Sequence, residues 1–457
     1  MNHPISTIPG PRGDFFLGSL PAIRRDRVQF LVDLQRDYGD VVKIRLGPIE
    51  GLTIFHPDAI RRVMQDNQSN YSKNTLAFNS MRLVFGNGLI TSDGDFWLKQ
   101  RRLMQPAFHK DRINDLCNMI VQKTQMMLDA LEGVAKSGQV VNISHEMMNL
   151  TMGIATQALF SSQVQDLDGQ LGEIIYILAS DTIFRFEHPF HPHPWFPTSH
   201  NRRFNSALKR LDEIIFGIIA GRRKHPGEKN DLLEMMMEAQ LDETNSAGGH
   251  LRRMTDKQLR DEIVTLLLAG HESTSINLCW TLYLLSQHPE VEARLRDEFK
   301  NVLCDRTPSL DTLPRLEYTR MVRDESMRLY PPVWLTERKP LEEDVLSGHR
   351  IPAGITIGIT QYVTHRHPDF WENPETFDPD RFSVERSKGR HDYAFFPFSG
   401  GGRQCLGKNL ALLEIQIILA MFLQRYRFEL KLGWQVSRDP VISLRLKGGL
   451  PMHLKTV

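Results

Sequence analysis

A glycine-rich segment near the end of the chain carries a cysteine well placed for chemistry. The segment runs Phe398-Ser-Gly-Gly-Gly-Arg-Gln-Cys-Leu-Gly407 and leads into a helical pattern. Three consecutive glycines permit tight turns and a close approach of the backbone to a flat or anionic ligand. Arg403 places a cation two residues before Cys405, and the electropositive start of a helix favours the thiolate form of a cysteine. The segment therefore indicates a ligand-binding or reactive thiol.

Three interpretations of this segment compete. It could be a glycine-rich turn around a buried structural cysteine. It could bind phosphate, although the pattern GxxxxGK followed by Ser or Thr is absent, because Asn409 follows Lys408. It could also present a thiolate ligand to a haem iron, with the glycines making room for the macrocycle and Arg403 facing a propionate.

Three other groups of residues could support such a site. Glu325 and Arg328 are three positions apart and share a helix face, although ion pairs of this spacing are common on surfaces. Trp97 and Arg101 place an indole N–H and a guanidinium on one face of what could also be an amphipathic surface helix. The segment Ala269-Gly-His-Glu-Ser-Thr274 puts polar residues inside an apolar helix, where they are poor choices for a core. Such residues indicate a locally opened helix beside a wet cavity.

The elements expected to position these side chains are mostly helical. Thr255 and Gln258 have the spacing of a capping box, and a long apolar stretch follows, so we expect a central helix over 255–287. Alternating residues around a Gly-Pro turn predict a β-hairpin over 40–55. The strands should be few and clustered at the two ends of the chain. The other expected elements are helices over 95–160 and 410–425, β structure over 351–364, a Pro-rich loop over 369–382 and a surface loop over 242–250.

The 457 residues have an ordinary globular composition, 41% hydrophobic and 24% charged, which excludes an intrinsically disordered chain. The 56 Lys plus Arg against 55 Asp plus Glu argue against nucleic-acid binding by bulk charge. The four cysteines form no CxxC pair, and no stretch of about 18 apolar residues occurs. Residues 1–18 form a Pro- and Gly-rich lead-in rather than a secretory signal. We expect one mainly α domain over 1–457 with small β-sheets, in a soluble, cytoplasmic, monomeric protein.

Four motifs, all in the expected order, resemble those of the cytochrome P450 superfamily. The cysteine segment matches the signature FxxGxRxCxG at Phe398, Gly401, Arg403, Cys405 and Gly407. The other matches are ExxR from Glu325 to Arg328, A/G-G-x-D/E-T around Glu272 and WxxxR from Trp97 to Arg101. The chain is thus identified as a member of this superfamily, of the soluble bacterial type, with similarity to its fatty-acid-hydroxylase-like branch.

The resemblance implies that haem b lies between the central helix and the cysteine loop within 369–425, with Cys405 as the axial ligand of the iron. It also implies a buried structural trio of Glu325, Arg328 and Arg381. The haem-binding residues that it implies are Trp97, Arg101, Arg338, Phe398, Gly401, Arg403 and Gly407.

The resemblance assigns proton delivery during oxygen activation to Glu272, Ser273 and Thr274, with Gly270 permitting a local distortion of the helix. The usual threonine position of the motif holds Ser273, and a threonine follows it. Serine keeps the hydroxyl and lacks the methyl group. We therefore expect Ser273, rather than Thr274, to carry the role.

The substrate pocket implied by the resemblance has apolar walls, although each of its residues could simply belong to the core. Apolar walls favour a fatty acid, terpenoid, steroid or polyketide-like substrate. The wall residues expected are Phe78, Phe85, Ala269, Val333, Leu335 and Ile442.

Three histidines, His188, His191 and His193, lie close together in a proline-rich stretch. The prolines exclude a regular helix, and no acidic residue or cysteine completes a tetrahedral metal set. We expect this stretch to form an aromatic, Pro-stiffened lid over the substrate entrance.

The implied activity is insertion of one oxygen atom from O2 into an apolar substrate, with electrons that come ultimately from NAD(P)H. The 457 residues include no flavin or nicotinamide module, so we expect a ferredoxin or flavodoxin and its reductase as partners. A basic patch could receive them, formed by Lys99, Arg102, Lys408, Lys388 and Arg390.

The rivals are a peroxide-driven or hydroperoxide-rearranging haem-thiolate enzyme and a non-catalytic haem sensor. The retained polar residues at 272–274 argue against the first, because it needs no proton relay.

Overall fold

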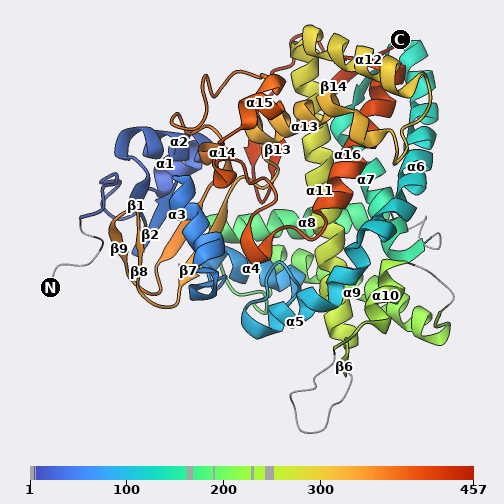
Figure 1. Cartoon of the computed structure of the whole chain (residues 1–457). Coiled ribbons are helices and arrows are strands. Elements are labelled where there is room, and N and C mark those ends of the chain that lie inside the picture. The colour runs from blue at the N-terminus through green and yellow to red at the C-terminus, as the bar shows by residue number, and fades with distance from the viewer. Residues whose placement is uncertain (1–4, 6, 162–167, 189–190, 228–230, 242–251) are drawn as a thin grey trace.

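The computed structural model of the chain divides into a strand-rich side and a helix-rich side (Figure 1). It describes residues 5, 7–161, 168–188, 191–227, 231–241 and 252–457, so the surface loop expected over 242–250 lies outside the described residues. The N-terminal strands β1–β3 and the strands β7–β10 lie together on one side of the molecule, whereas β11 and β14 lie with the helices. The long helices, including the central one, make up the other side. Within the described ranges, no helix combines the length and hydropathy that crossing a membrane requires.

Helices account for most of the chain, and short 3-10 turns and one π-helical turn at Arg62–Asp66 join some of them. The helices are α1 (Leu20–Arg25), α2 (Arg27–Tyr38), α3 (Pro57–Arg61), α4 (Leu76–Phe85), α5 (Gly94–Met104), α6 (Lys110–Ser137), α7 (Ile143–Phe160), α8 (Asp168–Glu187), α9 (Ser199–Lys224), α10 (Leu232–Glu238), α11 (Asp256–Gln287), α12 (Pro289–Leu303), α13 (Glu317–Leu329), α14 (Gln361–Thr364), α15 (Val384–Ser387) and α16 (Lys408–Arg425).

The strands form one sheet of order β1-β2-β10-β7-β3, a second of order β11-β14-β4 and three two-stranded pairs, β5-β6, β8-β9 and β12-β13. The strands are β1 (Val41–Leu46), β2 (Ile49–Ile54), β3 (Tyr71–Ser72), β4 (Val140–Asn142), β5 (Gln240–Leu241), β6 (Arg252–Arg253), β7 (Thr336–Pro340), β8 (Asp344–Leu346), β9 (His349–Ile351), β10 (Thr356–Ile359), β11 (Tyr426–Leu430), β12 (Arg438–Pro440), β13 (Leu444–Leu446) and β14 (Pro451–Thr456).

The two strongest sequence patterns are confirmed. The expected hairpin is β1 and β2, paired antiparallel from Val41 opposite Ile54 to Leu46 opposite Ile49. The expected central helix is α11, whose first turn has the complete capping box: Thr255 and Gln258 each accept a hydrogen bond from the backbone N–H of the other. The helix expected over 410–425 is α16, which begins two residues earlier.

Other expectations were wrong in detail. The β structure expected over 351–364 reduces to β9 and β10, because the hydroxyl of Thr360 accepts the N–H of Val363 and caps the short helix α14. The helical stretch over 95–160 is interrupted by β4, and β5 and β6 also lie mid-chain, so the strands are not confined to the two ends. β4 is too short to show a periodic pattern, and it forms because β14 from the far end of the chain pairs with it.

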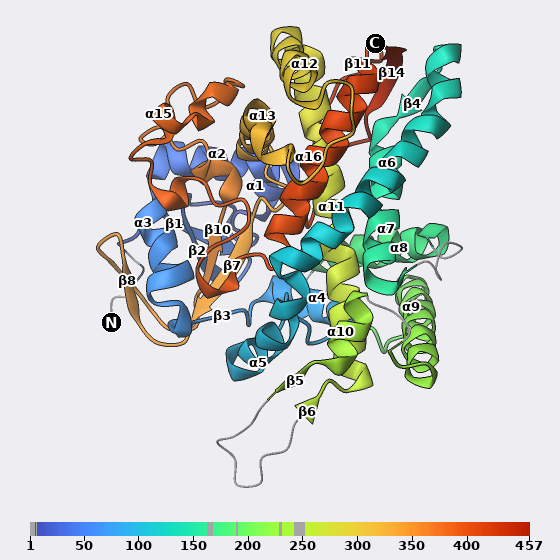
Figure 2. The ribbon, with the colours of Figure 1, turned by 45° about the vertical axis from the view of Figure 1, so that its right-hand side comes forward.

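The largest hydrophobic cluster places α11 and α16 in one core (Figure 2). It joins Trp280 and its neighbours on α11 to Ile417 and Phe422 on α16, and it includes side chains from α6, α7, α12 and α13. A second cluster surrounds the other half of α11 and contains Val264 and Leu268. Since α16 follows the cysteine loop directly, this packing fixes where the loop lies relative to the central helix.

Candidate active site

The glycines of the cysteine loop are required by its geometry. Gly401 has φ +60°, and a Cβ added there would lie 2.1 Å from the carbonyl oxygen of Met64. A Cβ at Gly400 would lie 2.3 Å from the hydroxyl of Tyr393. The backbone N–H of Cys405 donates to the carbonyl oxygen of Phe398 at 2.9 Å, which closes the loop. No side chain other than hydrogen fits this turn without moving its neighbours.

The remaining signature positions of the loop lie at its edges. Phe398 is half-buried against the main core. Gly407 is the N-cap of α16, and a Cβ there would make only an ordinary contact of 3.8 Å with the ring of Phe108. Leu406, next to the cysteine, packs on the second cluster, which contains Leu267 and Leu268 of α11. The loop and the central helix therefore share one neighbourhood.

The thiol of Cys405 is accessible, although protein surrounds it. The residue is exposed by its surface area, and yet burial raises the pKa of the thiol. The backbone N–H groups of Gly407 and Lys408 and the charge of Arg101 oppose this effect of burial without overcoming it. The protein alone thus favours the thiol, and a bound metal cation would convert it to thiolate.

The middle of α11 is accessible on one face only. Ala269 and Gly270 are exposed, whereas the helix is buried on both sides of them. Ser273 is half-buried on the same face and donates its hydroxyl to the carbonyl oxygen of Ala269 at 2.8 Å. Thr274 is buried, and its hydroxyl has no hydrogen-bond partner among the described residues. Of the two hydroxyls, that of Ser273 therefore lies on the accessible face.

Glu272 is buried beside this face and paired with the C-terminal hairpin. Its Oε1 atom accepts hydrogen bonds from the guanidinium of Arg445 and the hydroxyl of Ser443, each at 2.5 Å. Burial favours the neutral acid, but the charge of Arg445 and these two hydrogen bonds outweigh it and hold the pKa of Glu272 below its usual value. Glu272 is thus a buried carboxylate rather than a neutral acid.

Buried cations converge near the cysteine loop. Arg403 forms an ion pair with Asp93 and lies 4.0 Å from the ring centroid of Trp97. Burial lowers the pKa of Arg403 to about 10. Burial and, to a lesser extent, the nearby charge of Arg403 lower the pKa of Arg338 to about 10, while the charge of Asp93 opposes them. Arg101 lies 5.9 Å from the ring of Trp97 on α5, so the predicted pair does share a helix face.

Lys73 is a further cation of this group that the motifs did not reveal. It is buried, and its ammonium donates to the carbonyl oxygen of Ile90 at 2.6 Å. Burial lowers its pKa well below the usual value, and the charges of Arg403 and Arg338 lower it further. In the sequence, Lys73 follows the short strand β3 and belongs to no motif, so no pattern marked it as part of the site. Only the fold brings it to the arginines.

These residues fit a haem. Three buried cations lie here: Lys73, Arg338 and Arg403. Among the groups whose charges act on them, one is a carboxylate, that of Asp93. A ligand that carries two carboxylates would neutralise the excess positive charge, and charge-assisted hydrogen bonds to arginine suit such a ligand. The accessible thiol of Cys405 supplies a sulfur ligand for iron. The residues present therefore match both ends of the cofactor that the cysteine motif predicts.

The predicted structural trio is present and completely enclosed. The carboxylate of Glu325 contacts Arg328 at 2.6 Å and Arg381 at 3.3 Å. Arg328 also donates to the carbonyl oxygens of His365, which precedes the Pro-rich loop, and of Pro374 and Thr376 within it. The pair at 325 and 328 is thus not a surface ion pair, since both side chains have 0% exposure.

The predicted pocket residues differ in their surroundings. Phe85 is buried in the second cluster, and Phe78 is buried beneath the ammonium of Lys73, 5.1 Å from the ring centroid. Val333 is exposed, whereas Leu335 and Ile442 are half-buried. The last three are brought together by hydrogen bonds at 2.9 Å from the N–H of Leu444 to Pro332 and from the indole of Trp334 to Val441.

The histidine-rich connection between α8 and α9 shows no metal geometry in the part that the structure describes. Within the described ranges, no three His, Cys, Asp or Glu side chains gather as they would around a metal. His188 instead stacks on Phe184 with ring centroids 4.2 Å apart, and His200 lies 4.1 Å from the same ring. Residues 189–190 lie outside the described residues, so the lid stays a prediction.

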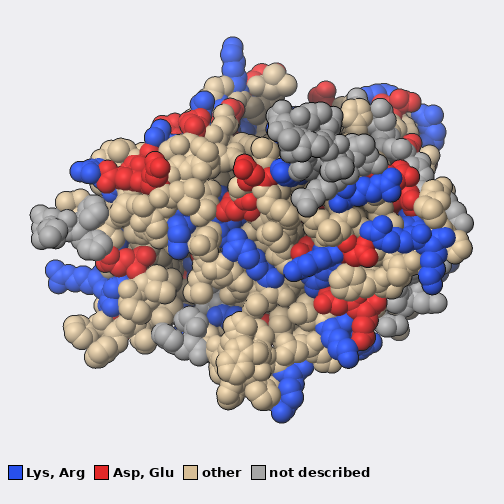
Figure 3. Space-filling model, turned by 90° about the horizontal axis from the view of Figure 1, so that it is seen from below, with Lys and Arg blue, Asp and Glu red and all other residues tan. Residues whose placement is uncertain are grey.

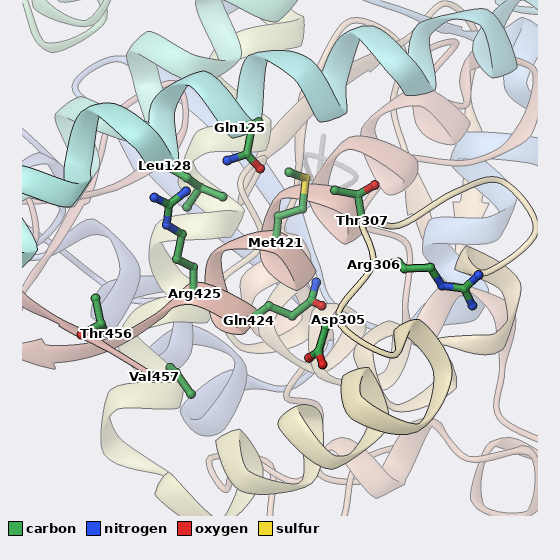
Figure 4. A pocket seen from close by; sticks show the side chains of 10 residues that line it. All are labelled: Gln125, Leu128, Asp305, Arg306, Thr307, Met421, Gln424, Arg425, Thr456 and Val457. Carbon is green, nitrogen blue, oxygen red and sulfur yellow. The ribbon is translucent and has the colours of Figure 1, made fainter.

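A hollow elsewhere on the surface is polar and remote from the thiol (Figure 4). It lies where the end of α16 meets α6 and the C-terminus, and Cys405 precedes the other end of α16, which is about 27 Å long. The hollow is lined by Gln125, Leu128, Asp305, Arg306, Thr307, Met421, Gln424, Arg425, Thr456 and Val457.

Comparisons with known proteins agree with this geometry. A family profile described as "Cytochrome P450" matches residues 8–445. The chain is 34% identical to cyclooctat-9-en-7-ol 5-monooxygenase of Streptomyces melanosporofaciens, over 93% of this chain and 90% of that protein. It is 31% identical to pentalenene oxygenase of Streptomyces avermitilis, over 92% of this chain and 88% of that protein. Its fold is similar to the crystal structure of the cytochrome P450DA haem domain, with TM-score 0.88, 24% identity and 98% coverage of both chains.

Proposed function

The chain belongs to the cytochrome P450 family and is a haem-thiolate monooxygenase, and on this premise we propose that it oxidises an uncharged cyclic terpenoid, an alkene or alkenol. Two relatives are named for such compounds, cyclooctat-9-en-7-ol and pentalenene. The names of these relatives carry the choice. The side chains of Val333, Leu335 and Ile442 suit such a substrate, because they are apolar and offer no charge to it. Membership of the fatty-acid-hydroxylase-like branch stays a prediction.

Haem, when bound, supplies the activation of O2 at its thiolate-ligated iron. The residues of the chain then have separate tasks. Cys405 would supply the sulfur ligand of the iron, and Lys73, Arg101, Arg338 and Arg403 would hold the propionates. Asp93, paired with Arg403, keeps that guanidinium oriented.

The polar residues of α11 carry protons. Ser273 offers its hydroxyl at the accessible face, and Glu272 lies next to it in the chain as a carboxylate that can receive a proton from solvent. Two protons are needed for the oxygen atom that leaves as water. A hydroxyl and a carboxylate in this order can relay them.

Electrons come, in this proposal, from NAD(P)H through a separate ferredoxin or flavodoxin. Lys99, Arg102 and Lys388 are exposed, but Arg390 is a poor member of the expected basic patch, because its guanidinium stacks 4.3 Å from the ring centroid of Trp371. The face of the molecule that lies at the bottom of Figure 1, where α5 is drawn, shows basic and acidic side chains interspersed (Figure 3). We therefore expect a moderate dependence of the reduction rate on ionic strength. A rate independent of salt would count against docking by charge.

The decisive experiment is a Soret titration of the ferric protein with limonene, palmitic acid and testosterone as probes of three substrate classes. We expect limonene to cause the largest shift from low to high spin, since an apolar ligand displaces water at the iron. Turnover with isotopically labelled O2 and a surrogate ferredoxin chain should then place one labelled atom in the product. A shift with palmitic acid alone would overturn the choice of substrate. Product without label would overturn monooxygenation of this substrate class.

A further inference from the structure

A buried ion pair joins the predicted proton-relay carboxylate to a hairpin at the other end of the chain. Both partners of Glu272 come from β13 or the residue before it, and they lie on the same side of the strand, two residues apart. Their hydrogen bonds converge on one oxygen, Oε1. The exposed fractions of the paired side chains are 10% for Glu272 and 21% for Arg445, so solvent screens the pair only weakly.

The hairpin itself is fixed to the walls of the expected pocket. The indole N–H of Trp280, two turns along α11, donates to the carbonyl oxygen of Leu444 at 2.8 Å. On the other side, Leu444 donates to Pro332, and Trp334 donates to Val441, as described above. The turn between β12 and β13 carries Ile442. A substrate that contacts Ile442 thus touches the element that holds Glu272, and Val333 lies between two residues, Pro332 and Trp334, that are hydrogen-bonded to it.

Arg445 is the group that compensates the charge of Glu272. The charged and titratable groups that act most strongly on Glu272 are Arg445 on the hairpin and His271 on its own helix. The Nδ1 atom of His271 is hydrogen-bonded to the carbonyl oxygen of Leu267 at 2.5 Å, and burial lowers the pKa of its imidazole, which favours the neutral ring. Without Arg445, the carboxylate would be buried and unpaired, a state that proteins avoid by protonation.

We propose that Arg445 is a positioning residue for oxygen activation, which holds Glu272 as a carboxylate docked on the β12–β13 hairpin and so links proton delivery to the position of that hairpin. The inference rests on the proposed role of Glu272 in proton delivery. The step moves protons only: Glu272 takes a proton from solvent, passes it towards Ser273 and returns to the carboxylate that Arg445 pairs. No other reactant is consumed.

The test compares Arg445→Gln with Arg438→Gln, a matched control. Arg438 lies on β12 of the same hairpin and bonds Tyr362 rather than Glu272. Each variant is purified with haem. The substrate is whichever of limonene, palmitic acid and testosterone gives the largest spin shift. The product formed per NAD(P)H consumed is then measured from pH 6 to 9. We expect Arg445→Gln to lower this ratio by roughly tenfold, less than the roughly hundredfold or more typical of losing a proton-transfer group. In this variant Arg445 no longer holds Glu272 ionised, so the ratio should rise with pH as the carboxyl group loses its proton. Arg445→Lys should restore the original pH profile.

The outcomes separate this inference from the function on which it rests. If Glu272→Gln uncouples turnover but Arg445→Gln has the ratio and pH profile of Arg438→Gln, the positioning role is wrong and the relay stands. If Glu272→Gln leaves the ratio unchanged, both are wrong. Should Arg445→Gln fail to retain haem, Arg445→Met, which removes the charge and keeps an unbranched side chain, provides the test. An unchanged pH profile in that variant would overturn the proposal.

Discussion

Ser273 donates its hydroxyl to the carbonyl oxygen of Ala269, 2.8 Å away and one helical turn earlier in α11. The bond joins the hydroxyl to an exposed stretch in the middle of the helix, where the neighbouring residues are mostly buried. Such a bond to the carbonyl four residues back competes weakly with the helix and tends to bend it. The helix therefore presents this hydroxyl and the accessible backbone of Gly270 to the same space.

Ser273→Ala should uncouple oxygen activation, whereas Thr274→Ala should not. The hydroxyl of Thr274 is buried without a partner, so its removal takes no proton carrier from the accessible face. We expect Ser273→Ala to lower product formed per NAD(P)H consumed by about tenfold or more and to raise peroxide release. If Thr274→Ala uncouples turnover and Ser273→Ala does not, the two hydroxyls have been assigned the wrong way round.

Glu325→Ala should give haem-free or misfolded protein. The substitution leaves two buried guanidinium groups, those of Arg328 and Arg381, without their carboxylate, at a cost of about 3–5 kcal/mol. The haem content per protein and the yield of soluble protein measure the effect. As a control, Glu213→Ala breaks an exposed ion pair with Lys209 and should change neither quantity. A stable, fully haem-loaded Glu325→Ala protein would refute the structural role of the trio.

Lys73→Met should weaken haem binding without destabilising the protein that lacks haem. In the absence of propionates the ammonium is an extra positive charge beside Arg338 and Arg403, so its removal relieves repulsion. With haem bound, the loss of a charge-assisted hydrogen bond should cost about 1.5–3 kcal/mol. The rate of haem transfer to apomyoglobin should rise by about tenfold or more, as 1.4 kcal/mol corresponds to a factor of ten. Lys257→Met, at an exposed position, is the control, and equal transfer rates would exclude a contact between Lys73 and haem.

Conformational stability should fall as the pH rises from 6 to 9. Burial raises the pKa of Glu262 and of Glu414 to about 8 each, whereas glutamate in an unfolded chain titrates near 4.3. Between these two values the folded state holds protons that the unfolded state has released. The stabilisation that this gives at low pH is therefore lost as the pH rises through about 8. Each group contributes a loss of up to about 2.5 kcal/mol over this range.

Urea denaturation at several pH values measures this loss. Glu262→Gln removes the titrating group and keeps an oxygen to accept the N–H of Leu89, so it should flatten the pH dependence. Glu213→Gln, at an exposed position, should leave the pH dependence as it is. A slope that Glu262→Gln does not reduce would show that this carboxyl group is ionised in the folded protein.

Much of the site could be predicted from the sequence because its parts are local patterns. The cysteine loop, the pair at Glu325 and Arg328, and the capped helix α11 each depend on residues within a few positions of one another. Spacing alone decides which side chains share a helix face, and only glycine fits the turn at Gly401. The same reasoning failed at Thr360, where a side-chain cap converts a β-branched stretch into the helix α14.

The motifs, the central helix and the conformation of the thiol loop follow from the order of the residues. The charges that surround them depend on the packing of distant segments. Lys73 meets Arg338 and Arg403 across the fold, Arg390 is stacked on Trp371 rather than free for a partner, and Glu272 pairs with Arg445, 173 positions away. A buried charge must find its partner wherever the packing brings one, and no periodicity along the chain records that partner. The burial that shifts the pKa of Cys405 is likewise a property of the packed molecule, not of the loop.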